Sequence, residues 1–298
     1  MAADVLDTAP FTISEADGVR AGPVRRPANF SKNAKGSIHD DERARELGFR
    51  GGTVAGNIHF EQFPPLLEAV LGPEWRRTGG LSLYFLTPTS DAEPVQAFAG
   101  PTRPRPEGGL RADVWMETPE GVRVCEGTAS VGPPDDHSAL RQRLAAVRPA
   151  ADLRILKGRN VGDRVAGIPS RQISEKTSPR VETITEPMDI YVDPSILGGL
   201  VAAPSAAIDA LREVEGPLFR AGDGFVGMFG AIELQFLDGP VFIDRDYLCD
   251  GQILALSESP KTEIAWYESI LRPADGGDPV ARLILMSRLL KASSPLWT

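Results

Sequence analysis

The chain has 298 residues, of which 42% are hydrophobic and 24% are charged, a composition that excludes disordered, collagen-like and membrane-spanning classes. At roughly 150 residues per domain, this length predicts two domains or two similar halves. The formal net charge of −9 opposes nucleic-acid binding, because the one basic run, from Arg20 to Lys35, is too short to offset it.

Neither the cysteines nor the apolar segments indicate export. Cys125 and Cys249 stand far apart and outside any CxxC motif, which argues against a disulfide framework or a zinc knuckle. Residues 1–19 are acidic and lack the apolar core of a signal peptide, and no run of about 18 apolar residues occurs. We therefore expect a cytoplasmic protein without a membrane partner. The histidines lack metal-ligand spacing, so no metal site is expected.

A diffuse internal repeat organises the sequence. Alternating apolar and polar residues predict a strand at 81–86 in the first half and another at 232–237 in the second. Trp115 and Trp266 follow these strands at the same spacing, and each lies in a segment that turns at acidic and glycine residues and returns as a strand. Each half therefore predicts a meander of about four antiparallel strands.

A helix is expected before the strands of each half, where a Gly-Gly pair opens an apolar run. In the first half the run spans 54–71, and the two prolines at 64–65 either kink this helix or begin a shorter one. In the second half the run spans 200–211. A further helix is expected between the halves, at 138–147.

This layout predicts an α+β fold in three parts. The first half covers 1–132, a linker with its helix covers 133–154, and the second half covers 155–298. We expect the two sheets to pair edge to edge into one continuous sheet, because this pairing removes two exposed sheet edges.

The most informative motif combines an aliphatic-His pair, a small residue, a Gly-Phe pair and a glycine that opens the expected helix: Ile38-His39, Ala44, Gly48-Phe49 and Gly56. It resembles the hydratase segment of the MaoC-like (R)-specific enoyl-thioester hydratases and dehydratases, which have a hot-dog fold. The repeated helix-and-sheet layout resembles the double hot-dog members of this family over nearly the whole chain. The family pattern has an Asp upstream of the His, at the position that Ala34 occupies here.

The resemblance implies a lyase that hydrates or dehydrates an enoyl or 3-hydroxyacyl thioester. It implies no separate cofactor, since coenzyme A or the pantetheine of an acyl carrier protein is part of the substrate, and it is compatible with a homodimer. It also implies that His39 is the general acid/base, since an imidazole exchanges protons near neutral pH. Asn33 or Asp40 would then orient the ring of His39.

The negative charge that develops on the thioester oxygen needs hydrogen-bond donors. The backbone N–H groups of Gly56 and Asn57, at the start of a helix, are candidates for this role. His59 could face the same pocket or be a hydrogen-bonded core residue. His39 could instead be a helix cap or a surface residue.

Two other functions fit the same residues. Glu61, with His59 nearby, could be the base or nucleophile of a hot-dog acyl-thioesterase, or it could be a solvated helix residue. The chain could also bind acyl thioesters without catalysis, because the family Asp is missing.

The second half offers further candidates for substrate binding. Aromatic residues at 225–229 and 266–267 could line an acyl tunnel or belong to the core. Arg282, Arg288 and Lys291 could bind phosphates or could face solvent at alternate strand positions.

Overall fold

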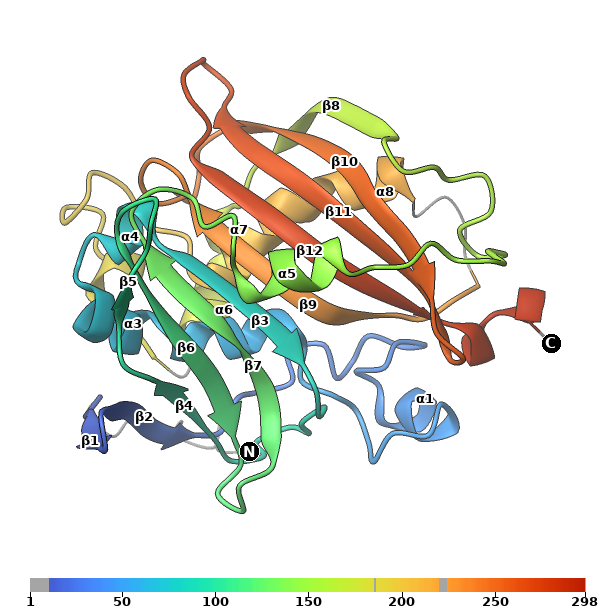
Figure 1. Cartoon of the computed structure of the whole chain (residues 1–298), viewed down its shortest axis with the longest axis horizontal. Helices are drawn as coiled ribbons and strands as arrows, with labels where there is room; N and C mark the ends of the chain where they lie inside the picture. The colour runs from blue at the N-terminus through green and yellow to red at the C-terminus, as the bar shows by residue number, and fades with distance from the viewer. Residues whose placement is uncertain (1–10, 185, 220–223, 298) are drawn as a thin grey trace.

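One antiparallel sheet of twelve strands extends through the computed structural model, which describes residues 11–184, 186–219 and 224–297 (Figure 1). The strand order is β1-β2-β4-β6-β7-β3-β9-β12-β11-β10-β8, and the short strand β5 pairs with β6. Strands β1 to β7 come from the first half of the chain, and β8 to β12 come from the second.

Strands and short helices alternate in the first half. The strands are β1 (Ser14–Ala16), β2 (Val19–Arg25), β3 (Gly80–Phe85), β4 (Val95–Ala99), β5 (Arg103–Pro104), β6 (Leu110–Glu117) and β7 (Arg123–Val131). The helices are α1 (Asp41–Glu46), α2 (Gly56–His59), the 3-10 turn η1 (Phe60–Gln62), α3 (Pro64–Leu71) and α4 (Trp75–Thr78).

The second half has longer strands. They are β8 (Arg164–Ser170), β9 (Gly227–Phe236), β10 (Tyr247–Glu258), β11 (Thr262–Pro273) and β12 (Ala281–Leu290). The helices are α5 (Ala139–Ala145) in the linker, α6 (Ser174–Val181), α7 (Pro204–Leu211) and α8 (Glu215–Leu218), with 3-10 turns η2 (Asp189–Tyr191), η3 (Arg212–Val214), η4 (Lys291–Ser293) and η5 (Pro295–Trp297).

The two strands that the repeat predicted are the ones that join the halves. Strand β3 pairs directly with β9, with Leu81 opposite Leu234 and Leu83 opposite Ile232. The prediction of one continuous sheet is therefore confirmed, as are the two predicted hairpins, β6–β7 and β11–β12. The chain has an α+β double hot-dog fold, as the sequence predicted.

The predicted helices are present, with changed boundaries. The apolar run at 54–71 divides into α2, η1 and α3, and its two prolines occupy the first turn of α3, so the shorter-helix alternative is confirmed. The run at 200–211 becomes helical only at Pro204, because Val201 first forms an isolated bridge with Phe242. The expected linker helix is α5, whose N-cap is Ser138.

The segments α2–α3 and α7–α8 pack against the sheet and fill its core. Phe60 and Phe63 from the first segment, and Ile208 and Leu211 from the second, are fully buried in one shared cluster. Helix α5 lies on the opposite face of the sheet from α7 (Figure 1). Because α2 and α7 contact each other, the beginnings of the two central helices lie side by side.

Within the described ranges, each helix is too short or too polar to cross a lipid bilayer.

A buried ion pair also connects the two halves, in addition to the pairing of β3 with β9. Arg25 on β2 donates to Glu186 through Nε at 2.7 Å and Nη2 at 3.1 Å, and each side chain is only 3% exposed. Burial raises the pKa of Glu186, while the guanidinium of Arg25 opposes that rise. The pair holds the segment between α6 and η2 against the first half.

We expect Arg25→Met to lower the free energy of unfolding by about 3–5 kcal/mol, because it leaves the carboxylate of Glu186 buried without this guanidinium. Urea unfolding followed by circular dichroism measures the change. The double variant Arg25→Met/Glu186→Leu is the control, and it should recover most of the loss because both charges are gone. A double variant that is as unstable as the single one would contradict this interpretation.

Candidate active site

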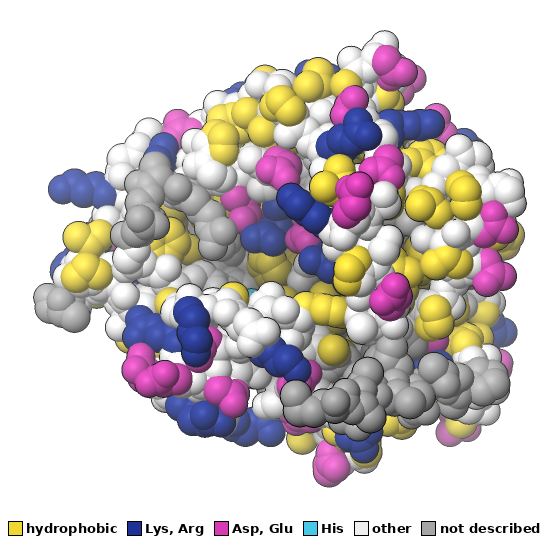
Figure 2. Space-filling model, turned by 180° about the vertical axis from the view of Figure 1, so that it is seen from behind, with side chains coloured by type: hydrophobic (Ala, Val, Ile, Leu, Met, Phe, Trp, Pro, Cys, Tyr) yellow, Lys and Arg dark blue, Asp and Glu magenta, His cyan; other side chains and the backbone are white. Residues whose placement is uncertain are grey.

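A cavity of about 390 Å³ lies between the two halves, and we call it the central cavity. Figure 2 shows a hollow on one face of the molecule where basic and acidic side chains gather. The first half contributes the segments around His39 and Gly56, together with Phe85 and Thr89. The second half contributes charged residues of α6 to α8, aromatic residues at 225–229, and the end of β12.

His39 lies in the wall of the central cavity and is half-buried. Its Nδ1 is 2.7 Å from the carbonyl oxygen of Thr53, and since a carbonyl only accepts, Nδ1 carries the proton. The neutral ring therefore has its lone pair on Nε2. Burial lowers the pKa of His39, the Thr53 hydrogen bond opposes this effect, and the charge of Arg212 lowers the pKa further.

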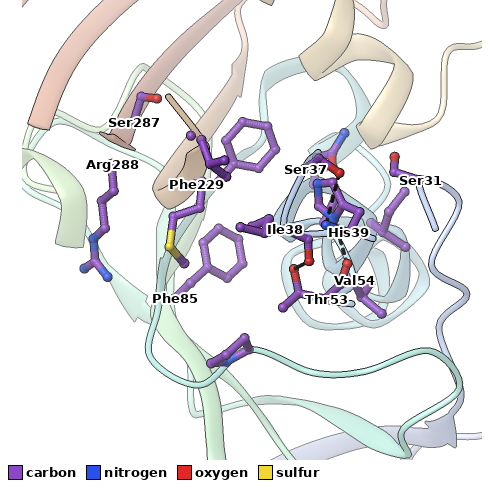
Figure 3. Close-up of a pocket in the computed structure, with 18 of the residues that line it drawn as sticks. Ser31, Ser37, Ile38, His39, Thr53, Val54, Phe85, Phe229, Ser287 and Arg288 are labelled. Carbon is purple, nitrogen blue, oxygen red and sulfur yellow. Dashed lines mark hydrogen bonds between the residues drawn. The ribbon is translucent and has the colours of Figure 1, made fainter. Parts of the chain in front are cut away.

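The local backbone requires glycine at two positions. A Cβ on Gly52 would lie 2.3 Å from the carbonyl oxygen of His39, so only glycine lets this segment approach the His39 segment. A Cβ on Gly56 would lie 2.7 Å from the ring of Phe85, which also lines the cavity (Figure 3). These glycines allow the His39 segment and the start of α2 to pack closely against their neighbours beside the cavity.

Neither residue that the sequence proposed as the partner of His39 has that role. Asp40 is the N-cap of α1, where its carboxylate accepts from the backbone N–H of Glu42. Asn33 is exposed and does not belong to the described lining of the central cavity. The orienting group is instead the backbone carbonyl of Thr53, which no side-chain motif could have revealed.

Asn57 and His59 are buried in α2 and line the central cavity. Nε2 of His59 is 2.9 Å from the hydroxyl of Thr89, and burial lowers the pKa of His59 to about 4. Nδ1 of His59 and Oδ1 of Asn57 are both buried without a hydrogen-bond partner among the described residues. Two unsatisfied polar atoms beside a cavity are what a polar ligand would satisfy.

Glu61 lies outside the described lining of this cavity. It is buried, and its Oε1 accepts from the backbone N–H of Ser205 at 2.8 Å, at the start of α7. Burial raises the pKa of Glu61 to about 7. Glu61 is thus neither a solvated helix residue nor in the same pocket as His39.

Asp209 is the counterpart of Glu61 in the second half. The two carboxylates stand at the same distance after the helix N-caps Ala55 and Ala203. Each reaches the first turn of the other half's helix, since Oδ1 of Asp209 accepts from Nδ2 of Asn57 at 3.3 Å. Unlike Glu61, Asp209 lines the central cavity.

Two arginines hold Asp209 in place. Arg180 on α6 donates from Nη1 to Oδ2 of Asp209 at 2.8 Å. Arg212 donates to Oδ1 of Asp209 at 3.3 Å and forms a bidentate pair with Glu215. The sequence does not single out Arg180, because α6 is a polar segment with an internal proline, Pro179.

The remaining candidates of the second half divide into two groups. Residues 225–229 and Arg288 line the central cavity, and Arg288 also donates to the hydroxyl of Tyr84 at 2.6 Å. Trp266 instead packs under α5, Tyr267 is buried in the core, and Lys291 pairs with Glu258. Arg282 lies near Glu268, outside the described cavity lining.

The sequence matches no protein-family model and no curated protein. Solved structures with a similar fold include a MaoC domain protein from Chloroflexus aurantiacus, with a TM-score of 0.61 and 13% identity over 95% of this chain and 98% of that one. A MaoC-like dehydratase has a TM-score of 0.54 and 14% identity over 93% and 97% of the two chains. A conserved hypothetical protein from Mycobacterium tuberculosis with a double hot-dog fold has a TM-score of 0.57 and 12% identity over 95% and 97%.

These similarities cover nearly the full length of every chain compared, so they support the double hot-dog fold independently of the strand order. At 12–14% identity they establish the fold, and the function must be argued from the cavity.

Glu61→Gln should make the stability of the protein less dependent on pH. The pKa of Glu61 is about 7 in the folded protein against an ordinary 4.5, so the native state loses stability as pH rises between these values. Above pH 7 this pKa shift corresponds to a loss of about 3 kcal/mol in the free energy of unfolding. Glutamine retains the oxygen that accepts from Ser205 but has no charge to bury.

Urea unfolding of both proteins at pH 5 and pH 8 measures this effect. We expect the free energy of unfolding of the variant to increase by about 2–3 kcal/mol relative to that of the wild type as the pH changes from 5 to 8. Other groups, including His59, titrate in both proteins and cancel in the difference. Parallel stability profiles for the two proteins would show that Glu61 is ionised in the native state at pH 5.

Proposed function

We propose that the chain catalyses the reversible hydration of a 2-enoyl thioester, with His39 as the general acid/base. The observation that supports this proposal best is the His39 ring in the wall of the central cavity, with its proton held on Nδ1 by the carbonyl of Thr53. This hydrogen bond leaves Nε2 with a lone pair that can accept a proton from water.

The reaction follows from this tautomer. Nε2 of His39 takes a proton from water as the water oxygen bonds to the β-carbon of the enoyl group. The electron pair of the double bond moves toward the thioester oxygen, where the backbone N–H groups of Gly56 and Asn57 stabilise the charge. The proton on Nε2 then passes to the α-carbon, which gives the 3-hydroxyacyl thioester and restores the neutral ring.

Asn57 and His59 supply polar contacts for the substrate in this proposal. Their unpartnered atoms are one acceptor, Oδ1 of Asn57, and one ring nitrogen, Nδ1 of His59. A low pKa keeps the His59 ring neutral at physiological pH, so its role is hydrogen bonding and not proton exchange.

Thioester hydrolysis through Glu61 and His59 is less well supported. Glu61 is outside the described cavity lining and accepts a hydrogen bond from the start of α7, which argues against its direct contact with a substrate beside His39. Binding of an acyl thioester without catalysis is the alternative that the experiment must distinguish from hydration.

Incubation with crotonyl-CoA separates these functions. Loss of the enoyl absorbance without release of free thiol supports hydration. Release of thiol supports hydrolysis, and calorimetric binding without either change supports a non-catalytic protein. The same assay with a crotonylated acyl carrier protein shows which carrier is used.

We expect His39→Ala to lower kcat/KM for hydration by about 10²- to 10⁴-fold, the usual contribution of one acid/base group. The Tm should change little, because the ring is half-buried and its side chain has one hydrogen bond. His137→Ala is the matched control, since His137 is exposed and lies outside the central cavity. Activity retained by a folded His39→Ala variant would reject the catalytic role.

The pH dependence of kcat/KM should show the lowered pKa of His39. Because hydration needs the neutral ring, activity should fall on the acid side only below the ordinary value of 6.5. We expect Arg212→Gln to move this acid limb toward higher pH, because the charge of Arg212 lowers the pKa of His39. A limb that stays in place in the folded variant would show that Arg212 does not act on this ring.

A further inference from the structure

The described lining of the central cavity has more cationic than anionic side chains, in a chain that is negative overall. This described lining includes four cationic and two anionic side chains: Lys35, Arg180, Arg212, Arg288, Asp209 and Glu215. The whole chain has a formal charge of −9. The excess of cations is therefore local to the site.

Arg180 is held in position by hydrogen bonds from only one of its three nitrogens. Its Nη1 donates to Asp209 and to the hydroxyl of Ser205 at 3.3 Å. Its Nε and Nη2 have no partner among the described residues, and its side chain remains 27% exposed. A guanidinium that is held by one nitrogen presents its other donors in a fixed orientation, so a carboxylate can bind them at little cost in side-chain entropy.

Arg212 adds a second charge from the same side. It lies over the ring of Phe229, with 4.6 Å between the guanidinium carbon and the ring centroid, and its side chain is 24% exposed. Its charge lowers the pKa of His39, and both residues line the central cavity, so Arg212 acts on the part of the cavity where the reaction would occur. A hydrocarbon chain in this place would remove water from Arg180 without replacing its hydrogen bonds, which is unfavourable.

We propose that the acyl group of the substrate ends in a carboxylate, which Arg180 binds with support from the charge of Arg212. This inference rests on the proposed function and names its substrate class. The phosphates of the carrier are a second source of negative charge. Lys35, which is 84% exposed on the rim of the cavity, suits a hydrated phosphate better than the partly buried arginines do.

Pairs of saturated thioesters that differ only in a terminal carboxylate test the proposal. The pairs are succinyl- and butyryl-CoA, glutaryl- and valeryl-CoA, and adipoyl- and hexanoyl-CoA, none of which has a double bond to hydrate. Isothermal titration calorimetry gives each Kd. We expect the dicarboxylic member of at least one pair to bind about 10- to 100-fold more tightly, the range for a hydrogen bond between charged groups.

Arg180→Gln should reduce this preference to near unity while leaving the affinity for the monocarboxylic thioesters nearly unchanged. Arg171→Gln is the control, because Arg171 pairs with Asp246 on the surface and lies outside the central cavity. Arg180→Lys keeps the charge without the planar fork and should give an intermediate preference. The Tm of each variant shows whether it is folded. If Arg180→Gln is not folded, the preference measured with Arg180→Lys tests the proposal instead.

Three results would overturn the proposal. If no pair shows a preference for the carboxylate, the substrate class is wrong while hydration of crotonyl-CoA still supports the proposed function. If Arg180→Gln weakens free coenzyme A and all thioesters equally, Arg180 binds the carrier and not the acyl group. If no thioester binds the wild-type protein, the proposed function and this inference both fail.

Discussion

The backbone pairing between β3 and β9 is the constraint on which the rest of the structure depends. It joins the two halves in a single sheet and places their central helices on one face of it. The first turns of α2 and α7 therefore meet, and the central cavity forms where residues of the second half face the segment that contains His39. The candidate site thus depends on backbone hydrogen bonds between β3 and β9, and not only on contacts among its own side chains.

Glu61 in the first half and Asp209 in the second half occupy equivalent positions but have different roles. Glu61 and Asp209 each reach the beginning of the opposite helix. Burial raises the pKa of Glu61 to about 7, whereas two arginines pair with Asp209. The first carboxyl holds the helices together, and the second belongs to the surface that a ligand would meet. Environment, and not residue type, separates a structural acid from one at a site.

Local pattern was sufficient to predict the central strands and helices of this fold, but not the polar helix α6. Strands β3 and β9, the helix that starts at the proline pair and the linker helix all follow from periodicity, turn residues and caps. The motif around His39 identified three residues of the cavity lining, Ile38, His39 and Gly56. The carbonyl of Thr53, the arginines and Asp209 could not be predicted, because they approach His39 and Asn57 only through the tertiary fold and have no sequence pattern of their own.

The continuous hydrogen-bond ladder across β3 and β9 also limits how the cavity can open. Two domains connected by a flexible linker can swing apart about a hinge, but strands of one sheet cannot separate without breaking their ladder. Entry and release of a ligand then depend on the segments that line the cavity outside the sheet, such as residues 35–37 and 86–89. Such loops fluctuate in nanoseconds to microseconds, so exchange at this site need not wait for the slower movements of whole domains.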